Sequence, residues 1–179
     1  MKKTAKDKRF DPAPRTMDQR AFVEKFGGVY ERFPEIAMRA FGEGLTRATD
    51  RAGGLAKAMA KVAASLDKPA KLQLIRNHPG LAGRLGVAEL TASSRSEQTG
   101  AGLDRCTPEE FARFQELNEA YKRRFEFPFI LAVSGKTRQA ILKAFESRIH
   151  NDRDTEFRTA LAEIDKIARI RLEALAKAD

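Results

Sequence analysis

Apolar residues recur along most of the chain at intervals of three and four positions, which places them on one face of an α-helix. Phe22, Val23 and Phe26 form the first such face, and Gly27-Gly28 is predicted to end that helix. The N-terminal half is predicted to contain four helices: one capped by Thr16, one opened by Pro34, one over Leu55–Leu66 after Gly53-Gly54, and one that starts at Asp67–Pro69 and ends near His78.

The C-terminal half contains the clearest helix start in the sequence. Thr107 is a suitable N-cap, Pro108 suits the first helical position, and Glu110 completes a capping box. Apolar residues then follow at helical spacing as far as Tyr121. Two further helices are predicted over about 137–148 and 154–176.

One apolar run does not fit this spacing. Phe127–Val133 could be a strand, but the sequence offers it no second strand to pair with. We therefore expect a buried extended segment that leads into the helix at about residue 137. The fold class predicted from the whole pattern is all-α, a single-domain bundle of about seven to nine helices.

Composition divides the chain into two parts. Residues 1–15 are basic, contain prolines and are poor in apolar residues, so we expect a short disordered tail. Residues 16–179 are long enough for one domain with a buried core. The single cysteine, Cys106, cannot form an internal disulfide and has no histidine or cysteine at metal-ligand spacing, so no metal site is expected.

The formal net charge of +9 raises the question of nucleic-acid binding. Part of this charge lies in the tail, and most other basic residues alternate with acidic ones along helical faces. We therefore expect small anionic ligands, with no nucleic-acid partner. No apolar stretch reaches the length of a membrane span, so no membrane partner is expected either. The last residues lack a Ser-Lys-Leu address, which favours a cytoplasmic setting, and a homodimer is the expected assembly.

The candidate chemistry lies in the central region of the chain. His78, one of only two histidines, is the side chain best suited to proton transfer near neutral pH. Because Pro79 disfavours helix at the preceding residue, we expect the imidazole at a helix C-terminus, open to a cleft. Glu97 and Gln98 could orient it or hold a polar ligand. The second histidine, His150, lies in a polar stretch and is expected to be a loop residue.

Five short motifs carry a resemblance to the OHCU decarboxylase family, whose name abbreviates 2-oxo-4-hydroxy-4-carboxy-5-ureidoimidazoline decarboxylase. They occur in this order: His78-Pro79-x-Leu81-Ala82, Ser94-x-x-Glu97-Gln98, Ala101-Gly102-Leu103, Phe127-Pro128-Phe129-Ile130, and Ala160–Ile164 with Arg169–Leu172. The resemblance extends from about Thr16 to Leu175. Two positions depart from the family's common pattern, since Gly80 stands where an acidic residue is common and Glu126 where glycine is common.

The resemblance implies an all-helical enzyme without a cofactor, which decarboxylates a small ureidoimidazoline to (S)-allantoin in urate catabolism. It implies that His78 is the general acid and base and that Glu97 is its partner. Pro79 would fix the approach of the histidine. The remaining residues implied to bind substrate are Ser94, Arg95, Ser96, Gln98, Phe127, Pro128, Phe129, Ile130 and Leu131.

Two other classes of function stay open from the sequence. One is a non-catalytic helical module that binds anionic partners through its basic faces. The other is a catalytically silent relative that serves as a subunit of a purine-degradation complex. The presence of His78, Glu97 and Gln98 favours the enzyme.

Overall fold

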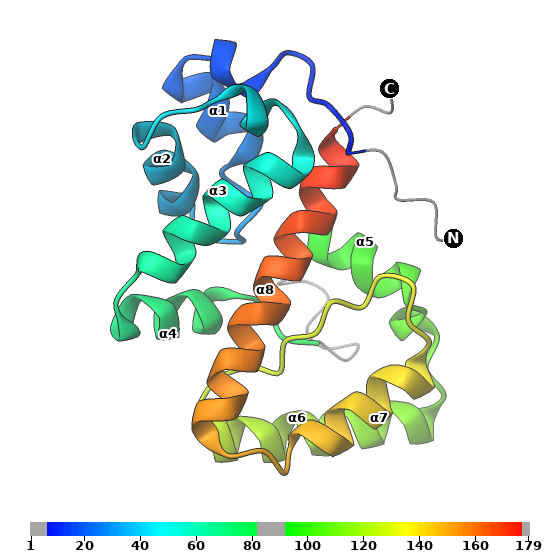
Figure 1. Cartoon of the computed structure of the whole chain (residues 1–179). Helices are drawn as coiled ribbons and strands as arrows, with labels where there is room; N and C mark the ends of the chain where they lie inside the picture. Colours follow the sequence, from blue (N-terminus) through cyan, green and yellow to red (C-terminus); the bar gives the residue numbers. More distant parts are fainter. Residues whose placement is uncertain (1–6, 82–91, 177–179) are drawn as a thin grey trace, which may run out of the picture. The chain divides into compact units, whose positions relative to one another are not determined.

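The computed structural model of the chain describes residues 7–81 and 92–176. Over these residues it contains eight α-helices and no β-strand, so the predicted all-α class and the predicted number of helices are confirmed (Figure 1). The chain divides into two compact units, one formed by residues 1–71 with 165–179 and the other by residues 72–164. Among the described helices, none combines the length and the apolar character needed to cross a bilayer.

The first unit has an aromatic core. Its elements are α1 (Gln19–Phe26), α2 (Glu35–Gly42), α3 (Ala52–Ser65), the start of α4 (Lys68–Asn77), the end of α8 (Arg153–Leu175), and the 3-10 helices Pro14–Thr16 and Arg47–Asp50. The fully buried ring of Phe22 lies 4.9 Å from Phe26 and 5.4 Å from Phe41, measured between ring centroids. α2 packs against both α1 and α3.

The start of α1 differs from the prediction. Asp18, not Thr16, is its N-cap, because the Asp18 carboxylate accepts a hydrogen bond of 2.8 Å from the backbone N–H of Ala21. Thr16 ends the preceding 3-10 helix, where its hydroxyl donates to the Ala13 carbonyl. Both residue types are good caps, and the short 3-10 helix decides between them.

The start of α3 also differs, since Gly53 and Gly54 lie inside its first turn instead of before it. A Cβ atom on Gly54 would lie 1.8 Å from the carbonyl oxygen of Ala48. The backbone N–H of Gly53 donates to the side chain of Asp7 at 2.8 Å. The two glycines therefore allow close backbone packing at this helix start instead of delaying it.

Part of the predicted tail is anchored to this unit. The side chain of Phe10 is 5% exposed, and its ring lies 5.0 Å from that of Phe26. Its backbone N–H donates to the carbonyl of Asp50, and the Lys8 carbonyl accepts from Ala52, both at 2.9 Å. The Phe10 ring and these backbone hydrogen bonds thus anchor the described part of the predicted tail, while residues 1–6 lie outside the described residues.

Two polar contacts tie the end of α8 into the first unit. Arg171 and Glu31 form a buried ion pair with an N–O distance of 2.9 Å, and their side chains are 7% and 2% exposed. The hydroxyl of Tyr30 donates to the carboxylate of Asp165 at 2.6 Å. Burial raises the pKa of Asp165 above its ordinary value, although the hydrogen bond from Tyr30 opposes this shift.

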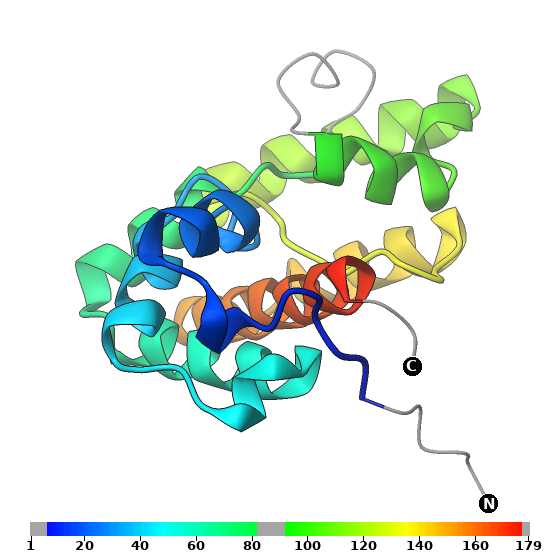
Figure 2. The same cartoon turned by 90° about the horizontal axis from the view of Figure 1, so that it is seen from above.

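The second unit contains the end of α4, α5 (Ala92–Gly100), a 3-10 helix over Leu103–Arg105, α6 (Pro108–Phe125), α7 (Arg138–Arg148) and the first part of α8. The predicted capping box of α6 is confirmed. The hydroxyl of Thr107 accepts from the N–H of Glu110 at 3.2 Å, and the Glu110 carboxylate accepts from the N–H of Thr107 at 3.1 Å. Figure 2 shows α6, α7 and the segment that joins them from above.

A buried polar cluster lies in the core of this unit, and we call it the Glu156 cluster: Tyr121, Arg148, Asn151 and Glu156. Glu156 has no exposed surface, and its carboxylate accepts from the Tyr121 hydroxyl, from Arg148 Nε at 2.9 Å and from Asn151 Nδ2 at 2.8 Å. These donors compensate the buried negative charge. The ring of Tyr121 packs edge-on against Phe129 and Phe145.

The predicted extended segment is confirmed as neither helix nor strand. Phe127–Val133 runs between α6 and α7, drawn in yellow in Figure 1 and Figure 2, and all of its residues except Pro128 are buried. This segment of apolar residues lies in the second unit, which also contains His78.

Candidate active site

His78 follows directly after α4, which ends at Asn77, so the predicted helix end is confirmed. The backbone N–H of His78 still donates to the carbonyl of Ile75 at 3.2 Å, and Pro79 then turns the chain. The imidazole is only 5% exposed, which differs from the expectation of a side chain open to a cleft. Leu81, three residues further along, is also buried, so the turn is directed inward and the histidine is buried with it.

We call residues 78–81 the histidine turn. Two side-chain amides from different helices donate to successive carbonyls of this turn. Gln98 Nε2, from α5, donates to the Gly80 carbonyl at 3.2 Å, and Asn118 Nδ2, from α6, donates to the Leu81 carbonyl at 2.8 Å. The backbone that follows the histidine is therefore held from two sides.

The residues predicted on α5 do not share one environment. Ser94 and Gln98 are buried and lie four residues apart, hence on one face of the helix. Glu97 is half-buried, whereas Arg95 and Ser96 are exposed. The structure thus connects Gln98 to the histidine turn and leaves the side chains of Arg95 and Ser96 toward solvent.

The extended segment meets the histidine turn at Gly80. A Cβ atom built on Gly80 would lie 3.1 Å from the Cβ of Pro128 and 4.0 Å from the carbonyl oxygen of Phe129. Such a contact is tighter than most side chains tolerate, so glycine permits this approach. An acidic residue, common here in the family that the sequence resembles, would require the two segments to separate slightly.

Side chains of Phe127, Phe129, Ile130 and Leu131 are buried, and Pro128 is half-buried. The Phe129 ring stacks on Phe145 with a centroid distance of 3.8 Å. The two phenylalanines pack in the aromatic core, and Pro128 lies next to Gly80, so the five residues can form an apolar wall beside the histidine turn.

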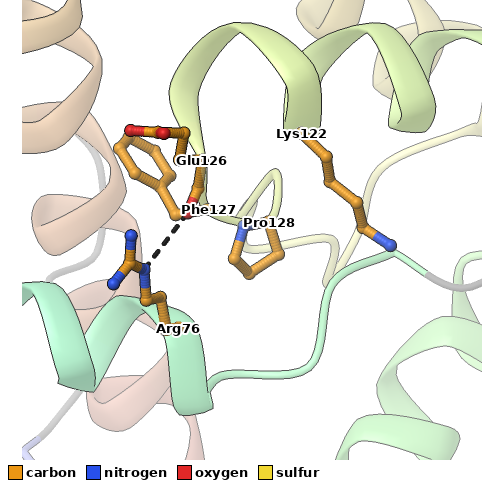
Figure 3. A pocket seen from close by; sticks show the side chains of 5 residues that line it. All are labelled: Arg76, Lys122, Glu126, Phe127 and Pro128. Atoms are coloured by element: carbon orange, nitrogen blue, oxygen red, sulfur yellow. Dashed lines mark hydrogen bonds between the residues drawn. The ribbon is translucent and has the colours of Figure 1, made fainter.

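A pocket of about 410 Å³ opens on this part of the second unit (Figure 3). Its lining residues are Arg76, Lys122, Glu126, Phe127 and Pro128. Of the predicted site residues, only Phe127 and Pro128 belong to this lining. Arg76 Nε donates to the carbonyl of Glu126 at 3.2 Å, drawn as the dashed line in Figure 3.

The backbone conformation at Glu126 explains why glycine is common at this position in the family that the sequence resembles. It caps the C-terminus of α6 with φ of 63°, in the left-handed region that favours glycine. The exposed carboxylate pairs with Arg153, and this hydrogen bond lowers the pKa of Glu126. Its charge is thus partly balanced at the edge of the pocket.

Sequence reasoning missed Asn118. It lies one residue after Leu117 on the amphipathic face of α6, half-buried, with its amide directed to the histidine turn. The available signal was a polar amide between the buried positions Leu117 and Tyr121, since a buried polar group must find a hydrogen-bond partner.

Over residues 7–81 and 92–176, the structure contains no group of three histidine, cysteine, aspartate or glutamate side chains able to hold a metal ion. The predicted site residues supply the buried imidazole of His78, the half-buried carboxylate of Glu97, two buried polar side chains of α5 and an apolar wall. Such groups can move protons and hold a small polar ring away from water.

Comparison with known proteins gives a consistent result. The family model described as OHCU decarboxylase matches residues 15–173. The 2-oxo-4-hydroxy-4-carboxy-5-ureidoimidazoline decarboxylase of Halalkalicoccus jeotgali is 41% identical over 158 residues, which cover 88% of this chain and 86% of that protein. The protein of the same name from Haloferax volcanii is 39% identical over 156 residues, or 87% of this chain and 89% of that one.

A solved structure shares the fold. The crystal structure of (S)-allantoin synthase matches with a TM-score of 0.73 and 26% sequence identity, over 92% of this chain. The chain spans 52% of the length of that solved chain, but most of the length of the two curated relatives above.

Proposed function

The chain belongs to the OHCU decarboxylase family, and from this premise we propose that it converts 2-oxo-4-hydroxy-4-carboxy-5-ureidoimidazoline to (S)-allantoin in urate degradation. The observation that carries the proposal is the identity of 41% over 88% of the chain to a protein of that name. The buried His78 beside an apolar wall supports it, because the reaction needs a proton donor in a site that excludes water.

The substrate itself can accept the electrons of the broken bond. When the carboxylate leaves as carbon dioxide, the pair of the broken bond forms a C=C bond within the ring, and the π pair of the neighbouring C=N bond moves to its nitrogen, which takes a proton. The hydroxyl on the decarboxylated carbon then loses its proton and becomes a carbonyl, while the C=C pair binds a proton at the adjacent carbon on one face. The protein has to place the ring and supply or remove protons, and this requires no external electron acceptor.

We assign the proton steps to His78, with Glu97 as its partner in proton transfer and orientation. Burial of the imidazole favours this role, since a general acid must be positioned within hydrogen-bond reach and shielded from bulk water. Delivery of the proton from one fixed side would explain the formation of a single enantiomer. Pro79 would hold the imidazole at that side by ending the helix.

We assign Ser94 and Gln98 to the ring and ureido groups of the substrate. These are the two buried polar side chains of α5, and an amide such as Gln98 offers both donor and acceptor atoms to an amide-like ring edge. Gln98 also holds Gly80, so its loss should loosen the histidine turn as well. Arg95 and Ser96 stay secondary binding residues in this proposal because their side chains are exposed.

The apolar residues from Phe127 to Leu131 would form the wall that excludes water from the leaving carboxylate. Four of these side chains are buried in the aromatic core of the second unit. In a pocket of low polarity a carboxylate loses hydration, which favours its departure as neutral carbon dioxide.

We further propose that the protein acts in the cytoplasm as a homodimer, with no nucleic-acid or membrane partner. Exposed apolar side chains, Met38 at 44% and Leu175 at 43%, support an interface. Surface ion pairs, such as Arg169 with Glu173, support the view that exposed cations are balanced by neighbouring acids. Sedimentation velocity tests the proposed homodimer, and binding to polynucleotides at several salt concentrations tests the proposed absence of a nucleic-acid partner.

The experiment for the activity generates the substrate in place from 5-hydroxyisourate and its hydrolase, and follows circular dichroism. We expect rapid accumulation of (S)-allantoin with the wild-type protein. Slow racemic product, equal with and without the protein, would contradict the proposed activity. With active protein, Glu97→Gln should lower kcat, whereas Gln98→Ala should mainly raise KM.

A further inference from the structure

The buried segment Phe127–Val133 is not helical, so its backbone N–H and C=O groups need hydrogen-bond partners outside the segment. Buried backbone N–H and C=O groups need hydrogen-bond partners, and an extended segment normally finds them on a neighbouring strand. No strand exists in residues 7–81 or 92–176. Two charged side chains take its place: Arg148 Nη1 donates to the Ile130 carbonyl at 2.7 Å, and Glu163 Oε2 accepts from the Ala132 N–H at 2.9 Å.

The two contacts come from different helices: Arg148 is the last residue of α7, and Glu163 lies on α8. Arg148 is itself paired with Glu156 on α8. Glu156 and Glu163 are seven residues apart, which is close to two helical turns, so their side chains point the same way. Glu163 binds the segment directly. Glu156 acts through Arg148, whose Nε donates to its carboxylate at 2.9 Å.

The same arginine also fixes a side chain of the segment. The Arg148 guanidinium lies 4.4 Å from the centroid of the Phe129 ring, and that ring stacks on Phe145 at 3.8 Å with 12° between the planes. Cation–π contact and stacking thus add to the backbone hydrogen bond. The rotation and the register of the segment are both constrained.

The direction of the remaining backbone groups follows from these contacts. In an extended chain, the C=O of one residue and the N–H of the second residue after it point to the same edge, whereas the groups of the residue between them point to the opposite edge. The Ile130 carbonyl accepts from Arg148 at the end of α7, and the Ala132 N–H donates to Glu163 on α8. The N–H and C=O of Leu131 are therefore directed to the other edge.

We propose that Arg148 and Glu163 are positioning residues, which hold Ile130–Ala132 in place. In this position the backbone N–H and C=O of Leu131 form hydrogen bonds with the amide-like edge of a cyclic ureide, in the way that two neighbouring strands pair. The proposal rests on the proposed function, since it concerns the same substrate. It assigns a role in binding, beyond their role in packing, to the buried Glu163 and to Arg148, whose side chain is 12% exposed.

A pair of substitutions at Glu163 separates positioning from packing. Glu163→Gln keeps an oxygen that accepts the Ala132 N–H, whereas Glu163→Ala removes it. We expect Glu163→Gln to retain KM within about twofold and Glu163→Ala to raise KM at least tenfold with a smaller change in kcat. Arg158→Ala, an exposed change on the same helix, should leave both constants unchanged.

Two further measurements do not depend on turnover. Hydrogen exchange at the Ala132 amide should become at least tenfold faster in Glu163→Ala and stay slow in Glu163→Gln. Titration of ¹⁵N-labelled protein with (S)-allantoin should shift the Leu131 amide resonance in the wild type, and this response should be lost in Glu163→Ala. A KM and a Leu131 response that are both unchanged in Glu163→Ala would overturn the proposal.

The outcomes also distinguish this proposal from the activity. If the wild type forms no (S)-allantoin, the proposed function fails, and the exchange of Ala132 and the response of Leu131 decide the positioning role alone. If Glu163→Ala does not fold, Arg148→Lys decides, because one ammonium group keeps the charge beside Glu156 but lacks the guanidinium's reach to Ile130. A folded Arg148→Lys variant with wild-type KM would likewise overturn the proposal.

Discussion

The Glu156 cluster permits a quantitative test of how the second unit is stabilised. Tyr121 is fully buried, and its hydroxyl donates to the Glu156 carboxylate. Tyr121→Phe removes only this oxygen, so the ring contacts with Phe129 and Phe145 stay in place. Glu156 keeps Arg148 as a donor, so its charge stays paired.

The expected loss follows from the hydrogen bond alone. A hydrogen bond to a charged group contributes about 1.5–3 kcal/mol. Because the carboxylate keeps other donors, we expect the lower part of this range, about 1.5–2 kcal/mol of unfolding free energy. For a protein of this size the corresponding fall in melting temperature is roughly 3–8 °C.

Urea denaturation followed by circular dichroism measures this loss, with Lys122→Ala, an exposed change on the same helix, as control. Burial and the neighbouring Glu156 raise the pKa of Tyr121, so the phenol stays a donor and the loss should be the same across the neutral and mildly alkaline range. A loss below about 0.5 kcal/mol, the size of an ordinary surface effect, would refute the reasoning.

Three further changes test other parts of the account. Thr107→Ala removes the capping box of α6 and should cost about 1 kcal/mol in urea unfolding; an unchanged midpoint would show that this cap contributes nothing. Burial raises the pKa of Asp165 above 3.8, so ionisation of this carboxyl lowers the unfolding free energy as pH rises. Asp165→Asn keeps an acceptor for Tyr30 and should become more stable relative to the wild type as pH rises from 4 to 7. A stability difference that stays constant with pH would contradict this. Asn118→Asp, an isosteric change, replaces the donor to Leu81 by a carboxylate and should lower the decarboxylation rate about tenfold with unchanged helix content; an unchanged rate would exclude a role for this contact.

The helices were predictable because their signals are local. The capping box of α6 and the end of α4 before Pro79 each depend on residues within one turn, and the structure confirms both. The alternative caps Thr16 and Asp18 show the limit of such signals. There the choice depends on a short 3-10 helix whose hydrogen bonds the sequence pattern does not reveal.

The candidate site was predictable only in part, because its geometry depends on contacts between distant residues. The burial of His78 follows from the inward turn at Leu81, and Asn118 reaches that turn from 37 residues further along the chain. Glu163 likewise reaches Ala132 across 31 residues. No periodic pattern encodes such pairings, whereas the need to satisfy a buried extended segment could have indicated that partners exist.

The two departures from the family's common pattern gain a physical meaning from the structure. Glu126 holds a left-handed conformation at the end of α6, which glycine adopts at no steric cost. Gly80 allows Pro128 to approach the histidine turn closely. Both positions adjust the backbone around the site, and neither replaces a residue to which we assign a proton step.

The measurement that tests the central claim most directly compares the two histidines of the chain. The initial rate of (S)-allantoin formation is followed by circular dichroism for the wild type, His78→Gln and His150→Gln, with helix content checked for each. Loss of a positioned general acid should lower the rate of His78→Gln at least about 100-fold. His150, exposed after α7, should be dispensable, so its variant should retain the wild-type rate. A folded His78→Gln protein that kept the wild-type rate and enantioselectivity would contradict the account.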